Sequence, residues 1–205
     1  AARAVGVSQN AMETAVRYAH EREQFGRPIG VFPRVGSKIG KMVVDTMVAE
    51  LQAASREGVS ALIDGGHADM GRSVAFLREI SEKSAMPIVA SGGYYIDQFH
   101  PPELESQTED DIAAALSDAA TAERWGAFGE IASSAEITPS ERKVLRAVGK
   151  AHLATGLPVF THNAYGTGEN VRPDTALRQL DVLESVGVSP SNIVIGHACC
   201  LDDPS

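Results

Sequence analysis

From residue 59 onward the chain alternates short apolar runs with amphipathic helical stretches, and this alternation limits the possible folds more than any other feature. A short apolar run between turn signals is typical of a strand that is buried on both faces of a parallel sheet. Strands that alternate with helices indicate a parallel α/β fold, either closed as a barrel or open and doubly wound. The predicted strands are residues 59–64, 87–92, 126–131, 157–162 and 192–197, and the predicted helices between them are residues 71–84, 112–122, 139–156 and 174–186.

Capping signals predict where two of these helices begin. Thr138-Pro139-Ser140-Glu141 combines an N-cap threonine, a proline at the first helical position and a glutamate three residues after the cap. Ser106 with Glu109 three residues later predicts a second capping box, ahead of the helix over residues 112–122.

The first 41 residues differ from the rest in pattern and in charge. Residues 1–40 hold six Lys/Arg and three Asp/Glu, whereas residues 41–205 hold twelve and twenty-four, so the acidic character lies in the second part. Helical spacing of apolar residues predicts one helix from Ala2 to about Glu23 and a second over residues 41–57, with Gly and Pro between them. We therefore expect a helical segment over residues 1–41 and a separate α/β domain over residues 42–205.

Composition excludes several classes of function. A net charge of −9 argues against nucleic acid or an anionic membrane as the main partner. No apolar run approaches the roughly 20 residues of a membrane helix. The two cysteines, Cys199 and Cys200, are adjacent and give no disulfide framework, which favours a cytoplasmic location. The chain begins without Met and ends in a loop-like sequence, so we expect it to be a fragment.

Three successive predicted strands end in Glu130, His162 and His197. The carboxyl ends of parallel strands meet at one edge of the sheet, so these side chains should lie together. One carboxylate and two imidazoles form a ligand set that zinc and similar ions accept. The alternative is that each histidine anchors a loop by a hydrogen bond. That alternative suits Glu130 less well, because burying an unpaired carboxylate costs several kcal/mol. Asp64 ends an earlier strand at the same level.

The remaining candidates lie on helices or in loops. We predict that His20 and His152 are solvated on helical surfaces, whereas His67 and His100 follow strands and could reach the site. Cys199 and Cys200 are interpreted as loop residues. The loop over residues 163–172 is expected to line the pocket.

Several motifs resemble the phosphotriesterase family of the amidohydrolase superfamily over residues 42–205. The resemblance implies a (β/α)8 TIM-type barrel, of which about five of eight strands are present. It also implies a two-metal centre, usually of zinc, with manganese or cobalt as alternatives. The motifs are Gly129-Glu130-Ile131, Ile137-Thr138-Pro139, Arg142-Lys143-Val144-Leu145-Arg146-Ala147, Thr155-Gly156-Leu157-Pro158-Val159, Thr161-His162, Gln179-Leu180-Asp181-Val182-Leu183-Glu184, Gly187-Val188 and Val194-Ile195-Gly196-His197.

The same resemblance implies roles for the site residues. Glu130 takes the place of the carboxylate that bridges the metals, and His162 and His197 match the imidazoles of the second metal. The implied reaction is hydrolysis of small-molecule phosphotriesters, lactones or related esters by a metal-activated water. The chain departs from the family pattern because it contains no His-x-His sequence and ends before the last strand, which carries a metal-binding Asp in the family.

Residues 1–41 resemble a different family. Arg22-Glu23-Gln24-Phe25-Gly26 and the residues around it are similar to the C-terminal helical domain of acyl-CoA dehydrogenases, which implies that Arg22 and Phe25 derive from a region near FAD. This leaves two alternative functions for the chain, an FAD-dependent acyl-CoA dehydrogenase fragment or an inactive truncated chimera. The open edges of an incomplete barrel also favour pairing with a second copy as a homodimer.

Overall fold

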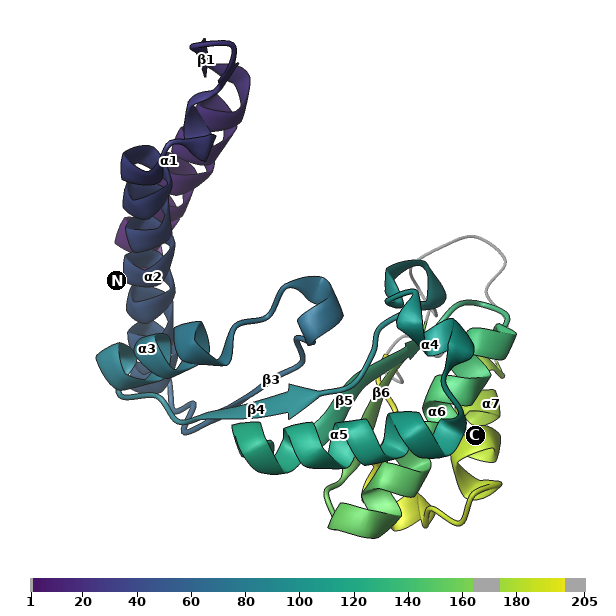
Figure 1. The fold of residues 1–205 in the computed structure, drawn as a ribbon. Coiled ribbons are helices and arrows are strands. Elements are labelled where there is room, and N and C mark those ends of the chain that lie inside the picture. Colours follow the sequence, from purple (N-terminus) through teal and green to yellow (C-terminus); the bar gives the residue numbers. More distant parts are fainter. Residues whose placement is uncertain (1, 164–173, 198–205) are drawn as a thin grey trace. The chain divides into compact units, whose positions relative to one another are not determined.

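The computed structural model describes residues 2–163 and 174–197 (Figure 1). Most of the loop expected to line the pocket, and both Cys199 and Cys200, lie outside the described residues. The chain divides into two compact units, one formed by Ala1–Leu62 with Ala75–Ile88 and the other by Ile63–Val74 with Val89–Ser205. Within the described residues, no helix has the length and apolar character needed to cross a bilayer.

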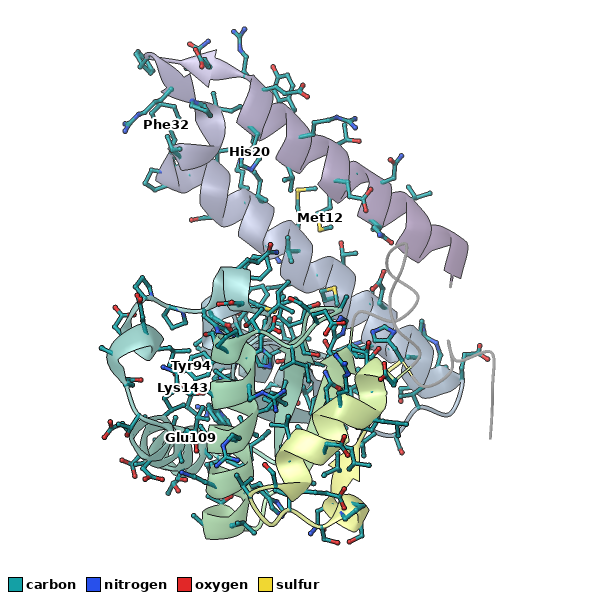
Figure 2. The ribbon with its side chains drawn as sticks, turned by 90° about the vertical axis from the view of Figure 1, so that its right-hand side faces the viewer. Met12, His20, Phe32, Tyr94, Glu109 and Lys143 are labelled. Atoms are coloured by element: carbon teal, nitrogen blue, oxygen red, sulfur yellow. The ribbon has the colours of Figure 1, made fainter. Side chains whose placement is uncertain are left out.

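The first unit is built on two long helices, α1 (Ala2–Glu21) and α2 (Pro33–Arg56), which run side by side (Figure 1). A short antiparallel hairpin of β1 (Glu23–Gln24) and β2 (Arg27–Pro28), followed by the 3-10 turn η1 (Ile29–Val31), joins them. Met12 of α1 lies on the side that faces α2 (Figure 2). The first predicted helix is confirmed. The second begins at Pro33 rather than residue 41, because proline suits the first turn of a helix.

A small apolar core completes the first unit. Val44 and Leu51 of α2 pack with Ile80 of α3 (Val74–Ser84) and with Met86. Leu62 and Ile88, at the starts of two strands, pack against the same cluster. Val44 and Leu51 therefore lie on the buried side of α2, whereas the equally helix-spaced Met47 is exposed.

A five-stranded sheet has the order β3-β4-β5-β6-β7, and its β4–β5, β5–β6 and β6–β7 pairs are parallel. Consecutive neighbours with a helix between them follow the order of a β/α barrel, whereas a doubly wound sheet reverses its strand order. The predicted partial TIM-type α/β fold is therefore confirmed. The strands are β3 (Leu62–Asp64), β4 (Ile88–Gly92), β5 (Ala127–Ser133), β6 (Val159–Asn163) and β7 (Ile193–Val194).

The main core of the second unit lies between the sheet and its helices (Figure 1). Phe128 and Ile131 of β5 and Val159 of β6 are fully buried against apolar residues of the helices, including Leu145 and Val148 of α6. The elements that connect the strands are the 3-10 turns η2 (Ala68–Met70), η3 (Asp97–Phe99) and η4 (Pro190–Asn192), and the helices α4 (Glu103–Ser106), α5 (Glu109–Glu123), α6 (Pro139–Thr155) and α7 (Thr175–Glu184).

One predicted capping box is confirmed and the other is wrong. The Thr138 hydroxyl accepts from the Glu141 amide at 3.1 Å, and Glu141 accepts from the Thr138 amide at 2.9 Å. Ser106 instead ends α4, and α5 is capped by a reciprocal pair of Thr108 and Asp111. A short aspartate reaches back to the cap as a glutamate does, so the later pair serves as the box.

Candidate metal centre

The sheet brings Glu130, His162 and His197 together. Glu130 lies within β5, which continues to Ser133 beyond its predicted end. His162 is the penultimate residue of β6. His197 lies three residues after the end of β7, in a turn with φ 57°, because β7 is shorter than predicted. The positions differ from strict strand ends, but the side chains still meet at one edge of the sheet.

The distances between these groups allow a test of whether they fit a metal ion. Nε2 of His197 lies 3.1 Å from Nδ1 of His162, and the same Nδ1 lies 3.6 Å from Oε2 of Glu130. In tetrahedral zinc sites, bonds of about 2.0–2.2 Å place neighbouring ligand atoms roughly 3.3 Å apart. Each of these two distances, taken by itself, is compatible with a pair of ligand atoms on one ion. Within residues 2–163 and 174–197, however, no group of three or more His, Cys, Asp or Glu side chains has the geometry to hold an ion.

The electrostatics of the site favour an ionised carboxylate. The pKa of Glu130 is lowered, chiefly by its interaction with His162, with further attraction from His197 and His67 and with burial acting in the opposite direction. At 3.6 Å the contact with His162 is longer than a hydrogen bond, and it is an ion pair only when the imidazole is protonated. The Glu130 side chain is 42% exposed and that of His162 is 17% exposed, so the carboxylate remains accessible from solvent.

Tyr95, a residue not predicted at the site, contacts it directly. Its phenol oxygen lies 3.1 Å from Nε2 of His162, and its backbone amide donates to Oδ2 of Asp69 at 2.9 Å. Burial raises the pKa of Tyr95, and the negative charge of Glu130 raises it further. The phenol therefore stays protonated at neutral pH. A signal for it existed in the sequence, since Tyr94 and Tyr95 directly follow the glycines at the end of β4.

His67 lies in a buried polar cluster close to the centre. Its side chain is fully buried, 3.6 Å from the carboxylate of Asp69, and neither of its ring nitrogens has a hydrogen-bond partner among the described residues. Burial lowers the pKa of His67, partly offset by Asp69, the Gly129 carbonyl and Glu130. His67 thus acts on Glu130 electrostatically without a direct bond. Asp64 also carries a buried oxygen, Oδ2, with no partner in the described part of the chain.

The other two predicted histidines have different environments. His100 bonds to Ser140 and to the Tyr95 carbonyl, away from Glu130 and His197. The prediction that His152 is solvated is wrong, because its residue is only 5% exposed and its Nδ1 bonds to the Leu157 carbonyl at 2.7 Å. Its other ring nitrogen, Nε2, lies 3.5 Å from the side-chain amide of Asn192 in η4. His20 is exposed on α1, as predicted.

A family model and the sequences of known proteins both match most of this chain. The family model described as phosphotriesterase family matches residues 36–204. The phosphotriesterase homology protein of Escherichia coli K12 is 31% identical over 75% of this chain and 52% of that protein. The N-acetyltaurine hydrolase of Rattus norvegicus is 30% identical over 75% of this chain and 44% of that protein.

A solved structure of a phosphotriesterase homology protein also resembles this chain. The crystal structure of the phosphotriesterase homology protein from Escherichia coli, complexed with phosphate in its active site, superposes with a TM-score of 0.66 at 29% identity. It covers 73% of this chain and 52% of that one. The chain thus spans about half the length of these relatives. The domain boundary after residue 41 and the acyl-CoA dehydrogenase resemblance of residues 1–41 remain predictions. The chain belongs to the phosphotriesterase family.

Proposed function

We propose that this chain is part of a metal-dependent hydrolase whose ion is held by Glu130, His162 and His197. The observation that carries the proposal is the convergence of His197 Nε2 and Glu130 Oε2 on His162 Nδ1, at 3.1 and 3.6 Å. The three side chains come from β5, from β6 and from the turn after β7, so the fold rather than a single loop sets their spacing. Membership of the phosphotriesterase family supports the same reading.

Each residue has a role that follows from its surroundings. The lowered pKa of Glu130 keeps its carboxylate anionic at neutral pH, as a metal ligand must be. With Nδ1 of His162 bound to an ion, Nε2 carries the proton and donates to the phenol oxygen of Tyr95, which fixes the ring orientation. A bound zinc ion, or manganese or cobalt in its place, would lower the pKa of a coordinated water to about 7 and polarise the substrate oxygen.

The proposed substrates are small molecules with a hydrolysable ester. Phosphotriesters, lactones and related esters are the first class. A relative named N-acetyltaurine hydrolase adds N-acylated amines as a second class, since an amide carbonyl is attacked in the same way. The exposure of the Glu130 carboxylate would leave room for such a substrate beside the ion.

Metal binding by the chain itself tests the proposal. Metal-free protein is titrated with Zn²⁺ by calorimetry, and with Co²⁺ by the visible absorption that reports its coordination. We expect His162→Ala, His197→Ala and Glu130→Gln each to weaken binding at least about tenfold, as expected for loss of a ligand. His20→Ala, which changes an exposed histidine of α1, is the matched control. Equal binding by the parent and by all three site variants would contradict the proposal.

Hydrolysis is then measured on the metal-loaded chain. A panel of one phosphotriester, one lactone, one aryl ester and N-acetyltaurine distinguishes the substrate classes. We expect activity to depend on added metal and to be lost in His162→Ala.

A further inference from the structure

A pocket of about 430 Å³ lies in the second unit, and its lining includes none of Glu130, His162 and His197. It is formed where the segment after β4 meets the first turn of α6. Its walls combine apolar side chains with charged and hydroxyl groups. The residues on which the argument depends are Asp97, His100, Pro102, Leu104, Ser140 and Lys143.

The hydrogen bonds of His100 fix its tautomer. Nε2 lies 2.9 Å from the carbonyl oxygen of Tyr95, which can only accept, so Nε2 carries the ring proton. In the neutral ring Nδ1 then presents a lone pair, and it lies 2.8 Å from Oγ of Ser140. The Ser140 hydroxyl therefore donates to His100. In enzymes with a serine nucleophile, the serine hydroxyl donates to one nitrogen of an imidazole, and a third group holds the other nitrogen. Ser140, His100 and the Tyr95 carbonyl have this arrangement.

The surroundings of the pair favour a positive charge on His100 and a negative charge near Ser140, which a nucleophilic attack by Ser140 would develop. The side chain of His100 is 4% exposed, and the carboxylate of Asp97 lies 3.8 Å from Nδ1, where it would stabilise an imidazolium. Ser140 lies in the first turn of α6, where the helix dipole favours negative charge. Of the neighbouring backbone groups, Pro139 has no N–H and the Glu141 amide donates to the Thr138 hydroxyl. Lys143, one turn further along α6 (Figure 2), places its ammonium group on the pocket wall, where it donates to the carbonyls of Glu105 and Gln107.

We propose that Ser140 and His100 form a second, metal-independent site that hydrolyses small carboxylic esters. Nδ1 of His100 takes the Ser140 proton as Oγ attacks the ester carbonyl. The tetrahedral intermediate collapses to an acyl-Ser140, and the alcohol leaves with the proton from His100. Water then attacks the acyl group, again losing its proton to His100. The carboxylic acid is released and the proton returns to Ser140, so that the site is regenerated.

The bond between His100 and Ser140 also ties the loop after β4 to α6, so the test must measure reactivity rather than stability. If the role of Ser140 is only structural, its hydroxyl should be as unreactive toward electrophiles as that of any other helical serine. A nucleophilic role predicts covalent labelling by a fluorophosphonate and by p-nitrophenyl acetate, both at Ser140. The label is located by fragmentation of the tryptic peptide that spans residues 125–142, which separates Ser140 from Ser133 and Ser134.

The labelling rate is measured on the whole metal-free chain. We expect Ser140→Ala to abolish the adduct and His100→Gln to slow it by about 100-fold or more, the usual contribution of a general base. Ser117→Ala, which removes a hydroxyl that bonds to the Ala113 carbonyl on α5, is the matched control and should react as the parent does. Absence of an adduct at Ser140, or an unchanged rate in a folded His100→Gln variant, would overturn the proposal.

A second variant keeps the proposal testable if His100→Gln does not fold. Ser140→Cys retains His100 and should be alkylated by iodoacetamide at least about tenfold faster than Ser117→Cys at pH 7, because a neighbouring imidazole lowers the pKa of a thiol. Peptide mapping separates both from Cys199 and Cys200. Equal alkylation rates of the two introduced thiols would count against an activating role for His100.

Discussion

The phenol oxygen of Tyr95 lies 3.1 Å from Nε2 of His162, on the opposite side of the imidazole from His197 and Glu130. The loop that carries Tyr95 is itself held in place. Asp69 accepts from the Tyr95 amide at 2.9 Å, and Nε2 of His100 donates to the Tyr95 carbonyl at 2.9 Å. The orientation of the His162 ring thus depends on a loop whose backbone is fixed at both its amide and its carbonyl.

Removal of the Tyr95 hydroxyl should release the His162 ring. In Tyr95→Phe we expect the side-chain ¹⁵N resonances of His162 to shift and the free energy of unfolding to fall by about 1 kcal/mol, the value of one hydrogen bond. Histidine-selective NMR and urea unfolding measure the two effects. Tyr94→Phe, the same change at the adjacent ring that contacts His100 edge-on, should leave the His162 resonances in place. Unchanged His162 resonances in Tyr95→Phe would show that the contact does not orient the ring.

The fold could be predicted from the sequence where the pattern was local and repeated. Alternating apolar runs and helices predict a parallel α/β fold, because each unit buries its own apolar residues against the next, but they leave a barrel and a doubly wound sheet open. The barrel order follows from the family resemblance and is observed in the sheet. Boundaries that depend on competing local signals were predicted less well. Ser106 and Glu109 have the spacing of a capping box, but Thr108 and Asp111 have it as well and form it. The end of β7 depends on pairing with β6, which covers only Val159 and Phe160 opposite Ile193 and Val194.

The candidate site was partly predictable for the same reason. Glu130, His162 and His197 recur at one level of successive β/α units, so periodicity alone placed them together. His67 is indicated by the sequence as a histidine that follows a strand and could reach the site, whereas Tyr95 is not. Tyr95 reaches the site through a loop, and the path of a loop depends on tertiary contacts that no local pattern encodes. The place of His152 on a helix predicts a solvated ring, but the residue is buried and its Nδ1 bonds to the Leu157 carbonyl.

A buried carboxylate at the start of α6 holds three segments together. Glu141 is fully buried and accepts from the amides of Asp97, Ser134 and Thr138 and from the Ser134 hydroxyl, at 3.2, 3.0, 2.9 and 2.7 Å. In Glu141→Gln a side-chain NH₂ group replaces one of the two acceptor oxygens and points at groups that themselves donate hydrogen bonds. We therefore expect the free energy of unfolding to fall by about 2–4 kcal/mol.

Urea unfolding followed by circular dichroism measures this loss. The matched control is Glu136→Gln, which makes the same change at an exposed glutamate that pairs with Arg178. It should unfold as the parent does, because exposed ion pairs contribute little. A loss of the same size in both variants would contradict a special role for the Glu141 hydrogen bonds.

The buried His67 should make stability depend on pH. Burial lowers its pKa in the folded chain below the ordinary value of 6.5. The unfolded chain therefore binds a proton near pH 6.5 while the folded ring is still neutral. Stability is fully present above this pH, falls by at most about 1.4 kcal/mol per unit as the pH decreases, and stops falling once the pH is below the lowered pKa.

Urea unfolding at pH 7.5 and at pH 5.5 isolates this effect by comparison with a variant. The parent should lose more stability between the two values than His67→Gln, in which the titrating ring is absent. His20→Gln, which alters an exposed ring, should follow the parent. The same pH dependence in the parent and in His67→Gln would show that His67 is not the responsible group.

Two glycines within helices should respond to alanine in opposite directions. A Cβ at Gly149 of α6 would lie 2.4 Å from Cγ2 of Val186, so the segment after α7 would have to move, whereas a Cβ at Gly40 of α2 would meet nothing within 4 Å. We expect Gly149→Ala to lower local stability by about 1–3 kcal/mol through overpacking. Gly40→Ala should raise it by about 0.5–1 kcal/mol, because alanine loses less backbone entropy in a helix. Amide hydrogen exchange within α6 and within α2 measures each change in its own unit. Slower exchange in α6 of Gly149→Ala would mean that Val186 moves aside freely and that the close approach of the two segments does not need glycine.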